Sequence, residues 1–156
     1  GVVDACRCLA WLVQAPGPFP VEFREALGDR IYGCDDCQEV CPPNVRSDRH
    51  QSGGTAAPDS AATVALVDLL DADDDTLLER HGRWYIAGRD PRHLRRNALL
   101  ALANTAEPDD AQVRRVVTRA RNGDDDLLRE HADWAAQRLT ARAAGAAAGP
   151  GTATAP

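Results

Sequence analysis

Apolar residues recur at helical spacing from residue 59 to residue 141, in short segments separated by acidic or glycine-containing breaks. Asp, Ser and Pro favour the beginnings of helices, while Gly and Asn favour their ends. Gly82 and Asn122-Gly123 are therefore expected to end two helices. The pattern predicts helices that begin near Asp59 or Ser60, at Asp73 to Asp75, at Asp90-Pro91, at Asp109 or Asp110, and at Asp124 to Asp126.

Two of the predicted helices share an internal repeat. Residues 94–102, LRRNALLAL, align with residues 128–136, LREHADWAA, at an offset of 34 residues. In each copy, acidic caps precede a Leu-Arg pair and a helix rich in small residues. Repeats of this length are typical of stacked helix pairs, which bury their apolar faces only against their neighbours. The repeat therefore predicts an α-solenoid arrangement.

The rest of the chain divides by composition. All five cysteines fall within residues 1–46, which also hold a Pro/Gly-rich stretch at residues 15–20. Residues 47–58 are polar and lack apolar periodicity, so we expect a linker there, followed by the helical domain over residues 59–141. Residues 142–156 form an Ala/Gly/Thr/Pro tail that we expect to be disordered. Because alanine is abundant and aromatic residues make up only 4%, the sequence favours a mostly α fold over a β-sandwich.

Charge and hydropathy narrow the range of partners. The net charge of −6 gives no whole-chain attraction for nucleic acid, so RNA binding would need a local basic patch. No apolar run approaches the length that spans a membrane, and no basic and apolar leader opens the chain. We therefore expect a cytoplasmic protein with no membrane partner. The chain begins with Gly1 and contains no methionine, so we expect it to be the C-terminal part of a longer polypeptide.

The cysteine spacing is the strongest chemical signal. Cys34-x2-Cys37-x3-Cys41-Pro42 matches the last three cysteines of the bacterial ferredoxin run C-x2-C-x2-C-x3-C-P. Two thiolates separated by two residues can reach two irons of one cubane, while the cysteine before proline ligates the other cubane in two-cluster proteins. Cys34 and Cys37 would share one 4Fe–4S cluster and Cys41 would serve a second. Within this chain only Cys8 and Cys6 could add a further ligand.

Other interpretations of the cysteines remain open at this point. A disulfide framework needs an oxidising compartment, which nothing in the sequence indicates. A zinc site could use C-x2-C with two more ligands and would make the chain a zinc-stapled binding module. A ferredoxin-type electron carrier fused to a helical interaction domain, without a further cofactor, would also fit the spacing.

Two longer runs are more specific than the spacing. Residues 7–12 are RCLAWL, and residues 23–42 are FREALGDRIYGCDDCQEVCP. The stretch from Asp4 to Pro42 that contains them resembles the epoxyqueuosine reductase family, the cobalamin-dependent iron–sulfur enzymes of tRNA queuosine biosynthesis. The resemblance implies a ferredoxin-like 4Fe–4S segment followed by HEAT-like helical repeats, in agreement with the repeat of 34 residues.

The resemblance also implies cluster ligands and partners. Cys8, Cys34 and Cys37 would bind one 4Fe–4S cluster with a fourth ligand upstream of this chain, and Cys41 would complete a second cluster. The enzyme would reduce epoxyqueuosine to queuosine in the anticodon stem-loop of tRNA, with electrons passing from a donor through both clusters to cobalamin. The group that protonates the epoxide is expected in an upstream N-terminal catalytic domain, so the chain alone is expected to be inactive.

Some positions depart from the family pattern. Cobalamin is expected to approach the backbone at Cys34 and Asp35, but Ala10 stands where the family usually has a serine that contacts cobalamin. Gly17 stands where the family has a lysine that contacts tRNA phosphate. Cys6 replaces a frequent arginine, and we expect it to be a small, partly buried side chain rather than a ligand.

The remaining candidates concern RNA. Arg92, Arg95 and Arg96 begin one predicted helix and could contact tRNA phosphates, as could the arginines of the next helix. The alternative is a solvated face paired with neighbouring aspartates. Trp84-Tyr85 and Trp134 could stack a base, although a tryptophan at helical spacing is more often core. Three histidines are expected to be surface or capping residues: His81, His93 and His131. Trp11 is expected to shield a cluster from water.

Overall fold

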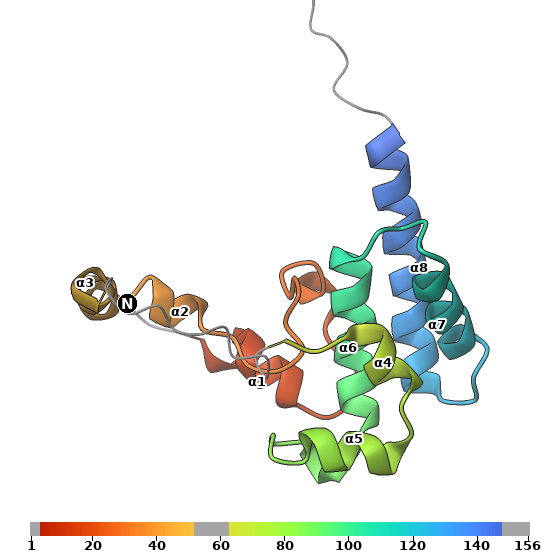
Figure 1. The fold of residues 1–156 in the computed structure, drawn as a ribbon, viewed down its shortest axis with the longest axis horizontal. Coiled ribbons are helices and arrows are strands. Elements are labelled where there is room, and N and C mark those ends of the chain that lie inside the picture. The colour runs from red at the N-terminus through yellow and green to blue at the C-terminus, as the bar shows by residue number, and fades with distance from the viewer. Residues whose placement is uncertain (1–3, 52–62, 148–156) are drawn as a thin grey trace, which may run out of the picture.

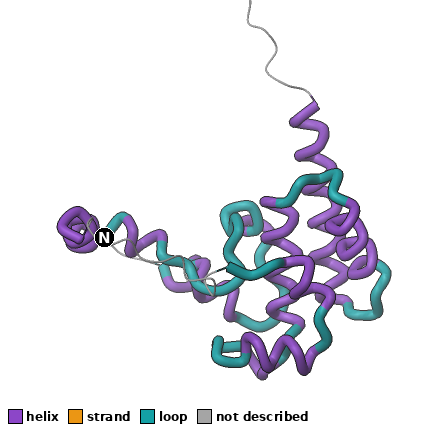
Figure 2. The backbone as a smooth tube through the Cα atoms, in the orientation of Figure 1, coloured by secondary structure: helices purple, strands orange, loops and turns teal. Residues whose placement is uncertain are grey.

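The computed structural model describes residues 4–51 and 63–147, and within these ranges every regular element is a helix (Figures 1 and 2). A mostly α fold is therefore confirmed. The cysteine-rich part contains the short 3-10 helices η1 (Ala5–Arg7) and η2 (Val21–Phe23) and the helices α1 (Leu9–Gln14), α2 (Asp36–Glu39) and α3 (Pro42–Gln51). The second part contains α4 (Leu66–Asp71), α5 (Asp74–His81), the 3-10 helix η4 (Ala87–Arg89), α6 (Arg92–Thr105), α7 (Ala111–Arg121) and α8 (Asp126–Ala147).

Side-chain caps fix the beginnings of several helices. Asp73 accepts a hydrogen bond from the Thr76 amide at 2.8 Å at the start of α5. Asp110 accepts from two amides at the start of α7, and Asp125 accepts from the Leu128 amide at 2.9 Å at the start of α8. These caps satisfy amides that have no partner within the helix. The predicted beginnings of these helices are confirmed.

Other boundaries differ from the sequence-based prediction. The first repeat-domain helix begins at Leu66, after an extended Ala65, and the proposed caps Asp59 and Ser60 lie outside the described residues. Asp90 accepts from the Arg92 amide, so α6 begins one residue later than the pattern suggests. Helix α3 continues to Gln51, inside the stretch 47–58 expected to be a linker, and α8 continues to Ala147, inside the tail expected to begin at residue 142. Local hydrogen bonding along a polar or alanine-rich helix continues without an apolar repeat to signal it.

Helices α4 to α8 enclose the main hydrophobic core. Helix α6 packs against α8 and α4, and α7 packs against α8. As Figure 1 shows, α6 and α8 run in the same direction. Helix α7, which connects them in the sequence, runs in the opposite direction. Leu99, Val116 and Ala132 lie at their contacts, each at most 1% exposed. This core accounts for the apolar spacing of the predicted helical region.

A second, smaller core joins the cysteine-rich part to α6. It consists of four buried residues from the segment 12–27 and one of α6, namely Leu12, Val13, Phe19, Leu27 and Leu100. Trp134 of α8 packs against this core. The segment from α1 to Ile31 is therefore fastened to the repeat domain and is not an independent unit. Beyond it, α2 and α3 project away from the body as an arm (Figure 1), and the residues from Asp35 to Val40 are all exposed. Within the described ranges, no helix is both long and apolar enough to cross a membrane.

Candidate metal centre

Four of the five cysteines lie at or next to the beginnings of helices, and Cys6 lies within η1. Cys8 is the N-cap residue of α1, and its carbonyl accepts from the amides of Trp11 and Leu12, both at 3.0 Å. Cys34 and Cys37 flank the start of α2. Cys41 precedes α3, and its carbonyl accepts from the Val45 amide at 2.9 Å. The chain therefore presents its thiols from three helix starts, with Cys8 on the body and the other two starts on the arm.

The turn before Cys34 depends on glycine and arginine. Gly33 has φ +78°, a left-handed conformation that other residues seldom adopt. Arg30 pairs with Asp36 at the beginning of α2. Burial alone would lower the pKa of Arg30, but the hydrogen bond and charge of Asp36, with the charge of Cys34, raise it.

The thiol side chains are of the type that binds an iron–sulfur cluster, but too few of them lie together to hold one. All five thiols are free, Cys6 and Cys37 are exposed, and Cys8, Cys34 and Cys41 are partly buried. Cys6 is thus more exposed than expected, because η1 has no buried residue. In the part of the chain that the structure describes, no three Cys, His, Asp or Glu side chains are grouped so that they could hold a metal ion. Since a cubane takes four thiolates, these cysteines could hold a 4Fe–4S cluster only with further ligands.

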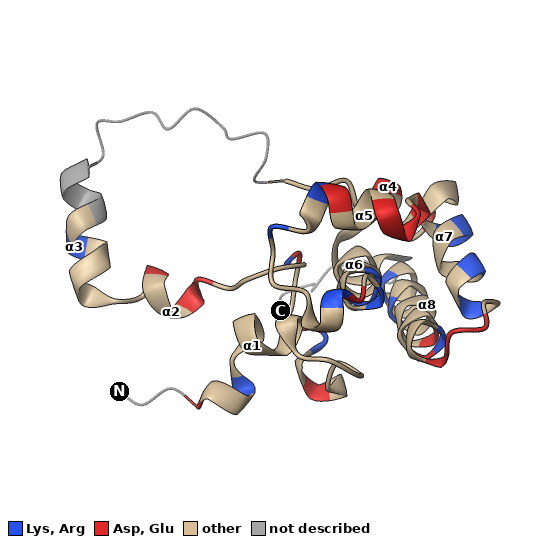
Figure 3. Ribbon diagram, turned by 90° about the horizontal axis from the view of Figure 1, so that it is seen from below, with Lys and Arg blue, Asp and Glu red and all other residues tan. Residues whose placement is uncertain are grey.

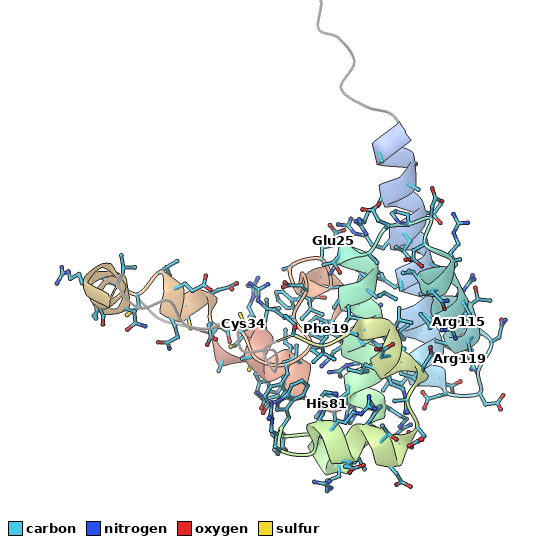
Figure 4. All side chains as sticks on the ribbon, in the orientation of Figure 1. Phe19, Glu25, Cys34, His81, Arg115 and Arg119 are labelled. Atoms are coloured by element: carbon cyan, nitrogen blue, oxygen red, sulfur yellow. The ribbon has the colours of Figure 1, made fainter. Side chains whose placement is uncertain are left out.

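The positions expected near cobalamin differ in their exposure. Ala10 is in α1 and partly buried, Cys34 is partly buried and Asp35 is exposed. The methyl group of Ala10 supplies no hydrogen bond, so any contact with the cofactor would fall to backbone groups and to Asp35. Figure 4 shows Cys34 where the arm leaves the body.

Arg96 is not available for RNA, contrary to the prediction from sequence. It is 1% exposed, and its guanidinium donates to the carbonyls of Leu12, Val13, Ala15 and Gly17. Burial, followed by the charge of Arg24, lowers its pKa to about 10, so it is charged at neutral pH. The charge is compensated by carbonyl oxygens at the end of α1 and in the following loop. The arginine thus holds the cysteine-rich part on α6.

Gly17 belongs to the same junction. It has φ +81°, its carbonyl accepts from Arg96, and its amide donates to His93 Nε2 at 3.4 Å. Without a side chain, and with its backbone engaged by α6, Gly17 offers no counterpart to a phosphate-binding lysine. The expected tRNA contact at this position is therefore reduced to backbone at most.

Two of the three histidines predicted to be surface or capping residues are buried and do not lie at the surface. His131 is fully buried; its Nε2 accepts from the Phe19 amide at 3.0 Å, and its Nδ1 lies 2.7 Å from the Leu127 carbonyl. Burial is the largest of the effects that lower its pKa to about 4, so the ring is neutral, with Nδ1 donating and Nε2 accepting. His93 is 7% exposed and binds Gly17 as described above. His81 remains partly exposed, stacked on Trp84 at 4.7 Å. The sequence contains one sign that the position of His131 is special, because His131 aligns with Asn97 in the 34-residue repeat. In the structure both residues are buried.

The aromatic residues divide into core and surface. Trp134 packs against the second core, as expected for a tryptophan at helical spacing. Trp84 is stacked between Tyr32 and His81, with its ring 4.8 Å from that of Tyr32. Trp11 and Tyr85 are 54% and 64% exposed. Trp11 therefore faces solvent in this chain, and its predicted shielding of a cluster stays a prediction.

The arginines on the outer helices are paired with aspartates. Arg92 binds Asp90 and Asp125, and Arg95 binds Asp74 at 2.5 Å. Figure 3 shows basic positions of α7 beside acidic positions of α4. Arg115 and Arg119, labelled in Figure 4, both bind Asp71 at the end of α4. This arrangement favours the solvated, aspartate-paired face over a free basic patch. Among the three predicted arginines of α6, Arg92 is the most exposed, with 51% of its side chain accessible.

Comparison with known proteins agrees with this geometry. Residues 1–44, which include all five cysteines, match the family model described as a 4Fe-4S double cluster binding domain. Epoxyqueuosine reductase from Vibrio cholerae is 37% identical over 92% of this chain and 38% of its own length. A crystal structure of epoxyqueuosine reductase with an epoxyqueuosine-modified tRNA-Tyr stem loop matches 88% of this chain and 36% of its own, with 33% identity and a TM-score of 0.70. Epoxyqueuosine reductase from Bacillus subtilis matches 88% of the chain at 31% identity, with a TM-score of 0.69.

The match to the double-cluster domain, joined to a helical domain, defines a protein of the iron–sulfur class. The agreement of sequence and fold over most of the chain shows further that it is homologous to the epoxyqueuosine reductases. It spans 38% of the length of the Vibrio cholerae relative and 36% of that of the tRNA-bound structure.

Proposed function

We propose that this chain is the part of an epoxyqueuosine reductase that provides ligands to two 4Fe–4S clusters and the helical domain that supports them. The observation that carries the proposal is the family-model match over residues 1–44, where the chain offers free thiols at ferredoxin spacing. A set of sulfur donors favours iron–sulfur clusters or zinc over hard cations. The match to a double-cluster domain favours the clusters over the zinc module.

The ligands divide between two clusters. Cys8, Cys34 and Cys37 bind one 4Fe–4S cluster, and Cys41 completes the other. The remaining thiolates come from outside this chain, in keeping with the short share of its relatives' length that the chain spans. The exposure of the arm is consistent with ligands that come from outside this chain, because α2 contains no buried residue and Val40 is 76% exposed. An arm with so little packing of its own is suited to be covered by a further domain, which we propose is the catalytic N-terminal domain.

Cobalamin is the proposed third cofactor, at the backbone of Cys34 and Asp35 and beside Ala10. When bound, the clusters and cobalamin supply the electrons that reduce epoxyqueuosine to queuosine. This chain's residues hold ligands and exclude water, and none of them is proposed as catalytic. Because Ala10 has no hydroxyl group, the cofactor contact there is one of packing only.

The proposed partners are tRNA, through its anticodon stem-loop, and an electron donor, in the cytoplasm. The tRNA proposal is supported by the solved relative that holds a tRNA stem loop. Of the three predicted arginines on α6, Arg92 and Arg95 remain as candidates, and each would exchange an aspartate for a phosphate. The helical domain would be HEAT-like, with α6 and α8 as equivalent helices of successive repeats.

Turnover of a modified stem-loop tests the function. The full-length protein, with clusters loaded anaerobically, would be given cobalamin, a reductant and an epoxyqueuosine-containing tRNA stem-loop, and the product nucleoside would be identified by mass spectrometry. We expect queuosine to form, and only when cobalamin is present. A protein that loads both clusters but neither binds cobalamin nor forms queuosine would instead be an electron carrier.

A further inference from the structure

One buried side chain connects the two backbone segments that hold the cysteines. Asn97 of α6 donates through Nδ2 to the Val13 carbonyl at 2.8 Å and to the Ile31 carbonyl at 3.0 Å. Val13 lies in α1, whose N-cap is Cys8. Ile31 is three residues before Cys34 in the sequence. A single amide group therefore links the stretch that begins at Cys8 to the stretch that ends at Cys34.

Asn97 has its orientation fixed by its neighbour. It is 0% exposed, and its Oδ1 accepts from Nε and Nη2 of Arg96 at 3.0 and 2.9 Å. With Oδ1 occupied by the guanidinium, the amide nitrogen points to the two carbonyls, and both of its hydrogens are used. A buried amide with all its bonds satisfied has one preferred position, because turning it would leave donors and acceptors unpaired in the interior.

Arg96 fastens the same segment at further points. Its guanidinium donates to the carbonyls of Leu12, Val13 and Ala15, at 3.2, 3.1 and 2.9 Å. These carbonyls are at the end of α1, where a helix has unpaired acceptors and favours positive charge. The arginine thus holds α1 by one end while Asn97 joins it to Ile31.

We propose that Asn97, oriented by Arg96, is a positioning residue that sets the distance from Cys8 to Cys34. The identity of these cysteines as ligands of a common cluster rests on the proposed function. A cubane is about the size of a side chain, so its thiolates must be held within narrow limits, and rigid second contacts are what hold them. The helical domain would then serve as a scaffold for the iron–sulfur site.

Asn104 offers a matched control on the same helix. Its Nδ2 also donates to two carbonyls of the cysteine-rich part, those of Arg24 at 2.8 Å and Gly28 at 3.3 Å. Both carbonyls lie in one loop, so the amide joins neither cysteine segment to the other. Asn104→Ala removes a similar pair of hydrogen bonds and should leave the distance from Cys8 to Cys34 unchanged.

The first measurement needs no cluster. Cys6, Cys37 and Cys41 would be replaced by Ser, nitroxide labels placed on Cys8 and Cys34, and the distribution of distances measured by EPR. Helical content by circular dichroism would confirm folding. We expect one narrow distribution in the parent and in Asn104→Ala, and one at least twofold wider in Asn97→Ala and Asn97→Asp. The aspartate keeps the shape and the acceptor for Arg96 but donates no hydrogen bond, so it guards against a simple packing defect.

Equally narrow distributions in Asn97→Asp and Asn104→Ala would overturn the proposal. A second measurement on the full-length protein follows the EPR signature of the reduced cluster. We expect Asn97→Asp to lower its amplitude severalfold and Asn104→Ala to preserve it, and an unchanged signature in Asn97→Asp would also overturn the proposal. If the unmodified full-length protein took up no iron, the proposed function would fail, while the label distances would still decide the role of Asn97.

Discussion

Asn97 and His131 occupy equivalent places in the 34-residue repeat, and both bind the backbone of the cysteine-rich part from the interior. Each is 0% exposed. Asn97 donates to carbonyls at positions 13 and 31, while His131 accepts from the Phe19 amide at 3.0 Å. Two helices of the repeat domain thus use the same face to hold one irregular segment, with a donor on α6 and an acceptor on α8.

The buried histidine makes stability depend on pH. Burial lowers the pKa of His131 to about 4, and the charges of Arg24 and Arg96 act in the same direction, against the hydrogen bond to Leu127 and the charge of Glu130. Because the unfolded chain takes up this proton near pH 6.5 and the folded chain does not, stability is complete above pH 6.5 and falls as the pH drops toward 4.

Urea unfolding at pH 7 and at pH 5 would measure this dependence. We expect the unmodified chain to lose about 1–2 kcal/mol more between these pH values than His131→Gln, which keeps an acceptor but does not titrate. The other titrating groups are common to both proteins. Equal losses in the two would show that His131 does not stay neutral in the fold.

Arg96 should matter for folding and Arg92 should not. Arg96→Ala would leave the carbonyls at positions 12, 13, 15 and 17 without their donor and remove the bonds that orient Asn97. We expect a loss of about 3 kcal/mol in the free energy of unfolding, measured by urea titration. Arg92→Ala removes only exposed ion pairs and serves as the matched control on the same helix. Similar effects of the two changes would contradict the structural role given to Arg96.

Binding of an anticodon stem-loop would separate the two interpretations of the outer arginines. If Arg92 exchanges aspartates for phosphate, Arg92→Ala in the full-length protein should weaken binding and reduce its dependence on salt concentration. Arg114, exposed on α7 and paired with Asp109, is the control. Fluorescence anisotropy over a range of salt concentrations measures both, and an affinity of Arg92→Ala equal to that of the unmodified protein would leave Arg92 as a partner of Asp90 and Asp125 alone.

The features that could be predicted from the sequence are those determined by residues close together along the chain. Caps such as Asp73 and Asp110 act on amides two or three residues away, so the beginnings of α5 and α7 follow from sequence alone. The junction could not be predicted in this way, because Arg96 and His131 find their partners 79 to 84 and 112 residues away. The sequence alone does not distinguish Arg96 from its exposed neighbour Arg92, because only the folded structure shows that Arg96 is buried at the junction. The spacing of the cysteines indicated their chemistry, whereas among the described residues they do not come together as a group of three metal ligands.

Metal analysis of the full-length protein tests the central claim most directly. After anaerobic reconstitution we expect about eight iron and eight sulfide per chain, as two 4Fe–4S clusters require. Cys37→Ala and Cys41→Ala should each lower both values by up to about half, through different clusters, while Cys6→Ala should leave them unchanged. Zinc without sulfide in the unmodified protein, or full iron content in both Cys37→Ala and Cys41→Ala, would contradict the assignment of these cysteines as ligands of two iron–sulfur clusters.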